Sequence, residues 1–214
     1  MLNRLRLPNF SYNSATGILT PQFTSSPVHK TLVSTIYTGL TNAVKSLPRD
    51  IQLSITIVTN EGFMGFKGVY LHSEKIPDVA IRKRDSQGIS RIKFIVEVGF
   101  SETYEKLVED ARLWLEGTST VSMVLIIKLE EVPGYKSPLT NLTDNEFDRL
   151  NFPPLTEIND ERFVFDGPYG PVRYKGLQWC GVVTGFLEFW AIHRVTRLAQ
   201  QITSRMVSHT LPHP

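Results

Sequence analysis

The segments PDVAI at residues 77–81 and FIVEVGFS at residues 94–101 decide the fold, together with the stretch after them that ends in LWL at residues 113–115. Residues 78–83 and 91–100 have the pattern of strands, and the turn residues DSQG lie between them. Residues 101–115 have helical spacing, with Ser101 as the expected cap, and residues 121–129 form a buried apolar run. A strand, a helix and a buried strand predict a crossover, so part of the sheet should be parallel.

The strand at residues 91–100 has two different faces. Side chains alternate between the faces of a strand, so Glu97 shares one face with Lys93, Ile95 and Gly99. The other face is wholly apolar, and Glu97 is therefore expected to lie opposite the main core. The apolar residues are Ile92, Phe94, Val96, Val98 and Phe100.

The rest of the chain is interpreted as support for this hairpin and helix. Residues 1–25 are expected to be an irregular basic arm, residues 26–132 a core domain, and residues 133–214 an extension packed on the same domain. Within the core, Ser26-Pro27 predicts a helix start, and further strands are expected at 51–57 and 66–71. The extension is predicted to hold a hairpin at 163–174 and a final helix at 186–206.

Composition places the chain among ordinary globular proteins, with 214 residues and a formal net charge of +2. The single cysteine, Cys180, excludes an internal disulfide and a zinc site built from cysteines, and it fits an intracellular location, cytoplasmic or nuclear. We identify no secretory signal and no apolar run long enough to cross a membrane, so no membrane partner is expected.

Charge is unevenly distributed along the chain. No Asp or Glu occurs before Asp50, and a basic group follows later in the sequence. Such a group suits the phosphates of a nucleic acid, although solvated strand edges have the same composition. The candidate phosphate-binding residues are Arg82, Lys83, Arg84, Arg91 and Lys93.

Asp78 and Glu97 are the candidate metal ligands. Mg²⁺, or Mn²⁺ in its place, prefers oxygen ligands, commonly one or two carboxylates completed by waters and phosphate oxygens. The carboxylates of Asp78 and Glu97, with the carbonyl of Val98, would supply such a set. A metal held there polarises a phosphodiester and lowers the pKa of a bound water.

The order helix, strand, strand, Asp-strand, Glu-strand, helix and buried strand resembles the PD-(D/E)xK, or restriction-endonuclease-like, superfamily over roughly residues 26–130. The segment EVGFSE at 97–102 is also similar to a group of uncharacterised fungal proteins with an EVG-x-S pattern. The resemblance implies an α/β (α+β) fold with a restriction-endonuclease-like core, a mixed central sheet flanked by helices. It also implies Mg²⁺-dependent cleavage of nucleic acid, DNA rather than RNA.

The chain departs from the superfamily pattern at two places. Gly99 stands where the pattern has a lysine, and the first helix has His29 in place of an acidic residue. Lys106, on the following helix, and Lys128, on the next strand, are the candidates to replace the lysine, with Lys106 preferred. A pair between Lys106 and Asp110, one helical turn apart, is the competing interpretation.

Other candidate residues are assigned ordinary roles. The histidines have no spacing that suggests zinc. Tyr104 and Trp114 are expected in the core, and Cys180 is expected to be a buried apolar residue.

Three functional hypotheses remain open. The first is a metal-dependent nuclease, and the second is a nuclease fold without catalysis that binds nucleic acid or protein. The third is a self-associating module whose homodimer interface is formed by Phe186, Phe189 and Trp190. Structural alternatives also remain: Asp78 begins a strand, and Glu97 pairs with Arg82 or Lys93.

Overall fold

The computed structural model describes residues 9–22, 26–167, 169–203 and 206–208. The described residues divide into two compact units, one formed by those up to Lys128 with those of Leu187–Met206, and the other by those of Leu129–Phe186 with Val207 and Ser208. Among the described residues, no helix is both long and apolar enough to cross a membrane.

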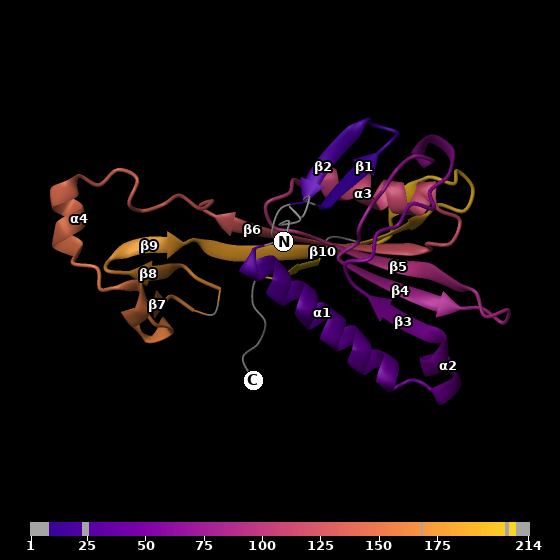
Figure 1. The fold of residues 1–214 in the computed structure, drawn as a ribbon, viewed down its shortest axis with the longest axis horizontal. Coiled ribbons are helices and arrows are strands. Elements are labelled where there is room, and N and C mark those ends of the chain that lie inside the picture. The colour runs from indigo at the N-terminus through magenta and orange to yellow at the C-terminus, as the bar shows by residue number, and fades with distance from the viewer. Residues whose placement is uncertain (1–8, 23–25, 168, 204–205, 209–214) are drawn as a thin grey trace, which may run out of the picture. The chain divides into compact units, whose positions relative to one another are not determined.

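A mixed sheet of seven strands, flanked by helices, forms the centre of the fold (Figure 1). Its strand order is β11-β10-β6-β5-β4-β3, and β12 pairs with β10. Neighbours β3, β4 and β5 are antiparallel, whereas β5 and β6 are parallel and are joined through α3. The predicted crossover is therefore confirmed. The elements are β3 (Ile55–Val58), β4 (Val79–Arg84), β5 (Ser90–Gly99), α3 (Tyr104–Gly117), β6 (Met123–Val132), β10 (Val182–Ile192), β11 (Ala199–Gln201) and β12 (Met206–Ser208).

Helices cover both faces of the central strands. Helix α1 (Pro27–Lys45) packs its apolar stripe against Val79, Val96 and Val98, and α3 packs against the opposite face. As predicted, Ser26 caps α1, accepting from the backbone N–H of His29 at 3.2 Å, and Pro27 begins the helix. The cap of α3 is Thr103 and not Ser101, because the Thr103 hydroxyl accepts from the Lys106 backbone N–H.

The expectation that Glu97 lies opposite the main core is wrong. The larger buried cluster lies on the Glu97 side of β5, where α3 contributes Leu107, Leu113 and Trp114. An irregularity in the β4–β5 pairing breaks the alternation, so that Ile92 joins the same cluster as Ile95.

Three predictions for the first half of the chain need correction. Within the predicted irregular arm, β1 (Asn9–Asn13) and β2 (Ile18–Gln22) form an antiparallel hairpin, and residues 1–8 and 23–25 lie outside the described residues. Residues 49–54 form the short helix α2 (Arg49–Ser54) before β3 begins. Residues 66–71 hold the 3-10 helix η1 (Gly68–Tyr70) instead of a strand, because Phe66 packs into the main core and the Lys67 backbone N–H donates to the Gly117 carbonyl at 2.7 Å.

The predicted final helix at 186–206 is also wrong. Residues 182–192 form the long strand β10, which is followed by β11 after a turn. Phe186 and Trp190 are buried, and Phe189 is half-buried with its ring centroid 6.5 Å from that of Phe94. These aromatic residues therefore pack largely within the chain.

The second unit is described by itself. Its predicted hairpin is confirmed, since β7 (Val164–Phe165) pairs with β8 (Val172–Tyr174), and β9 (Leu177–Cys180) extends it to three strands. Helix α4 (Asp144–Leu150) begins with a capping box between Thr143 and Glu146. Cys180 is half-buried, not fully buried. The remaining elements are the 3-10 helices η2 (Leu155–Glu157) and η3 (Asp160–Arg162).

Candidate active site

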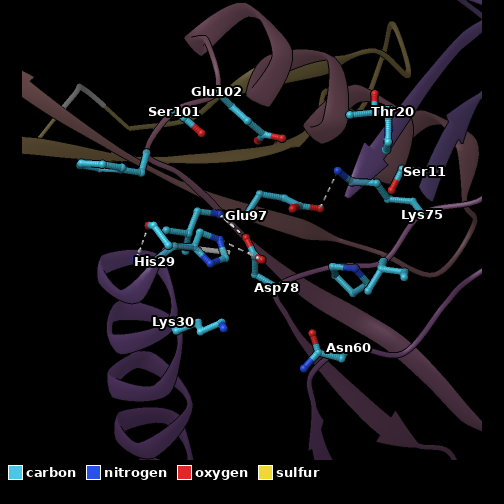
Figure 2. A pocket seen from close by; sticks show the side chains of 16 residues that line it. Ser11, Thr20, His29, Lys30, Asn60, Lys75, Asp78, Glu97, Ser101 and Glu102 are labelled. Atoms are coloured by element: carbon cyan, nitrogen blue, oxygen red, sulfur yellow. Dashed lines mark hydrogen bonds and ion pairs between the residues drawn. The ribbon is translucent and has the colours of Figure 1, made fainter. Parts of the chain in front are cut away.

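A cavity of about 610 Å³ opens where β4 begins and β5 ends. Asp78, directly before β4, and Glu97, near the end of β5, both line this cavity, as does Val98. Figure 2 shows Lys75 extending toward Glu97 and His29 approaching Asp78 from α1. The two acids proposed from sequence therefore belong to one site.

Asp78 is held by two groups that fix its carboxylate. The backbone N–H of Val98 donates to Oδ2 at 2.7 Å, and His29 Nε2 lies 3.2 Å from Oδ1. The hydrogen bond to Asp78 raises the pKa of His29 above 6.5, outweighing the opposite effect of burial. His29 thus has a specific partner where the sequence suggested an ordinary role.

Glu97 is almost completely buried, with 4% of its surface exposed. Trp114 Nε1 donates to Glu97 Oε1 at 2.6 Å, and Lys75 Nζ lies 3.9 Å from the same oxygen. Burial raises the pKa of Glu97 well above its ordinary value, and the charges of Asp78 and Asp110 add to the effect against the opposing charge of Lys75. The predicted partners Arg82 and Lys93 are not the groups that pair with it, because the Arg82 guanidinium lies 2.6 Å from Glu61 Oε1.

Lys75 is the site residue that the sequence did not reveal. It is buried, and its Nζ donates to Asp110 Oδ2 at 2.7 Å. Burial alone lowers the pKa of Lys75, but Glu97 and Asp110 outweigh this effect and raise the pKa above its ordinary value. Lys75 is therefore a charged ammonium beside Glu97. Asp110 and Trp114 are one turn apart on α3, so one helix face orients both Lys75 and Glu97.

Gly99 has a packing reason to be glycine. A Cβ atom at this position would lie 2.6 Å from Leu107 Cδ1, and Leu107 is fully buried. Close packing of α3 on β5 therefore disfavours any side chain at residue 99, the position at which the sequence resemblance implied a lysine.

Neither lysine proposed as its substitute lies among the described residues that line the cavity. Lys106 pairs with Asp110, which agrees with the competing interpretation from sequence. Lys128 donates to the Phe100 carbonyl at 3.0 Å.

The basic group is separated from the candidate acids. Arg82–Arg84 lie four to six residues beyond Asp78 on β4, about 13–20 Å along the strand. Arg91 and Lys93 lie toward the start of β5, whereas Glu97 lies near its end, and Arg91 pairs with Asp85 at 3.5 Å. The structure does not bring these five residues into the cavity that Asp78 and Glu97 share.

The pair between His29 and Asp78 predicts a pH dependence of stability. Because the folded-state pKa of His29 is raised, its stabilisation is fully present below the unfolded pKa of about 6.5 and is lost as the pH rises through the folded pKa. We expect His29→Gln to lower the free energy of unfolding by about 1–2 kcal/mol near pH 6, and by less at pH 9. Urea denaturation in the presence of a chelator measures this difference, with the exposed His72→Gln as control. An equal loss at both pH values would contradict the prediction.

Comparisons with known proteins add no family to this description. No family model matches the chain, and searches of curated proteins and of solved structures find no match.

Proposed function

We propose that this protein is a metal-dependent nuclease of the PD-(D/E)xK type, in which Lys75 replaces the lysine missing at Gly99. The observation that carries the proposal is the convergence of Asp78, Glu97 and Lys75 on one cavity, with Lys75 Nζ 3.9 Å from Glu97 Oε1. An active site of this type needs two acids and one lysine within reach of a common point. Strands β4 and β5 bring the acids together, and the segment before Asp78 supplies the lysine.

The donor atoms suit Mg²⁺ or Mn²⁺. Asp78 and Glu97 offer carboxylate oxygens to the same cavity, and Val98 lines it beside them. No group of three or more His, Cys, Asp or Glu residues in the described ranges is placed to hold a metal, but Mg²⁺ commonly uses one or two carboxylates and completes its shell with water and phosphate oxygens. When bound, such a metal supplies a bound water of lowered pKa and polarises the phosphodiester.

Lys75 has the properties of an electrostatic stabiliser. Its raised pKa keeps the ammonium protonated, so it does not act as a base. One of its three donors is directed to Asp110. The ammonium also lies 3.9 Å from Glu97 Oε1, and the Lys75 side chain lines the cavity. A fixed cation at such a site stabilises an oxygen on which negative charge develops.

Binding without catalysis is the second candidate function. His29 favours it, because its imidazole lies 3.2 Å from Asp78 Oδ1, one of the oxygens that a metal would need. In that case the cavity would bind nucleic acid, and the affinity would survive loss of the Asp78 carboxylate.

Cleavage of labelled DNA with Mg²⁺ or Mn²⁺ tests the nuclease. We expect the wild type to cleave, and Asp78→Asn and Glu97→Gln to fall to the background of the assay, with circular dichroism confirming that both variants are folded. Glu105→Gln is the matched control, because this exposed acid lies in the first turn of α3 and is not among the residues that line the cavity. Absence of cleavage with either metal, or cleavage retained in both variants, would overturn the proposal that the protein is a nuclease.

A further inference from the structure

We infer, on the basis of the proposed nuclease function, that the cavity takes a single strand of nucleic acid and excludes a duplex. The β1–β2 hairpin forms one wall of the cavity through Ser11, Thr20 and Pro21. The start of α1 and the loop between β5 and α3 supply further walls. The candidate acids therefore lie in a recess, the cavity described above, whose walls come from several elements, and Figure 2 shows side chains from these elements around them.

The hairpin wall is attached to the rest of the unit by backbone hydrogen bonds. Tyr12 and Glu74 exchange N–H···O bonds of 2.7 and 2.9 Å. The neighbouring Ser14 N–H donates to Ser73 Oγ at 2.8 Å, and the Ser14 hydroxyl donates to the Val69 carbonyl at 2.8 Å. These bonds hold the hairpin beside the segment that leads to Lys75. The hairpin is consequently a fixed wall of the cavity.

The size of the recess fits one strand. Cavities of roughly 300–1,000 Å³ enclose drug-sized ligands, and one or two nucleotides have that size. The volume here is about 610 Å³. Within it Glu97 and Lys75 are only 4% and 6% exposed, so a phosphodiester must enter the recess to reach them. A strand held in a duplex has its partner strand attached and cannot enter in this way, whereas a free strand or an unpaired end can.

The positive charges at the cavity are few, and their number fits a short contact with one strand of nucleic acid. Lys30 and His29 line the cavity on the α1 side, and the basic group of β4 and β5 lies about 13–20 Å or more from Asp78 along the strands. Each phosphate contact with a single strand contributes about −0.7 to the slope of log affinity against log salt concentration. One contact at Lys30 gives a slope of about −0.7, whereas five duplex contacts through the basic group give about −4.5.

Fluorescence anisotropy with a labelled oligothymidylate and with a duplex of equal length tests the inference without requiring cleavage. Measured in a chelator, we expect the single strand to bind at least tenfold more tightly, with the shallow salt slope. Thr20→Trp, which fills the cavity from the hairpin, should weaken binding of the single strand at least tenfold. Leu19→Trp is the matched control, because this exposed neighbour is not among the residues that line the cavity, and it should change the affinity by less than twofold.

The outcomes separate the two proposals. Equal or tighter binding of duplex, no binding of either polymer, or no effect of Thr20→Trp would overturn the strand preference, even if the wild type cleaves DNA. Selective binding of the single strand without cleavage under any metal would overturn the nuclease and support the strand-binding cavity.

Discussion

Replacement of Lys75 by Met is expected to lower the free energy of unfolding by about 3–5 kcal/mol. Lys75 is the ammonium that lies between two buried carboxylates, 2.7 Å from Asp110 and 3.9 Å from Glu97. Asp110 is 1% exposed and Glu97 is 4% exposed, so water cannot replace the lost cation. Removing one partner of a buried ion pair leaves the other charge uncompensated, which costs more than the pair itself contributes. Urea denaturation at pH 7 measures the loss.

Lys106 provides the matched control for this prediction. It pairs with the same Asp110 carboxylate, but its side chain is 22% exposed and solvent screens the charge. Lys106→Met is therefore expected to cost about 1 kcal/mol or less. Adding Glu97→Gln to Lys75→Met should restore part of the lost stability, because Glu97 loses its paired ammonium whereas Asp110 keeps Lys106. Equal losses for the two lysine variants, or a stable Lys75→Met protein, would contradict the ion-pair account of the site.

Replacement of Gly99 by Lys, the residue that the sequence resemblance implied at this position, is expected to lower the free energy of unfolding by about 1–3 kcal/mol, the usual cost of overpacking a core, and to bring no gain in the proposed cleavage. The clash arises at the first side-chain atom, because a Cβ there would lie 2.6 Å from Leu107 Cδ1. Leu107 is fully buried in the main core, so a shift of its side chain disturbs the packing of α3 on β5. Gly99→Ala should therefore show a cost of the same order, and urea denaturation of both variants checks this.

Gly39 provides the contrasting glycine. It lies within α1, and a Cβ there would meet no atom within 4 Å. Gly39→Ala is expected to stabilise the protein by about 0.5–1 kcal/mol, because alanine has the higher helix propensity. If Gly99→Ala stabilised the protein as Gly39→Ala should, the close packing of α3 on β5 would not explain why residue 99 is glycine.

The local sequence pattern was sufficient to predict the central helices and strands of the fold. The cap Ser26 with Pro27 predicted the start of α1, and alternation predicted β4 and β5. The apolar run after α3 predicted a strand parallel to β5. These features depend on residues close together in the sequence, and there the hydrophobic period and the cap residues indicate the local structure directly. The two candidate acids, Asp78 and Glu97, could be predicted from the sequence for the same reason, since each lies near the end of a regular strand.

Sequence pattern failed where non-local pairing decides the conformation. Residues 186–206 contain apolar residues at helical intervals, but residues 182–192 take strand conformation within the seven-stranded sheet. The hairpin of β1 and β2 is similarly attached through backbone bonds between Tyr12 and Glu74, which no local period signals. Tertiary pairing overrides a weak local preference in such segments.

The sequence by itself determined the two acids, the strands that present them and the helix that follows. Only the tertiary structure decided which cation accompanies them, because Lys75 lies in an irregular segment and reaches Glu97 and Asp110 from 22 and 35 residues away. It also decided why Gly99 is glycine, since the constraint comes from Leu107 on another element. Burial and contacts between residues distant in the sequence fix the charge and the geometry of the site. Neither burial nor such contacts can be deduced from the local spacing of residues.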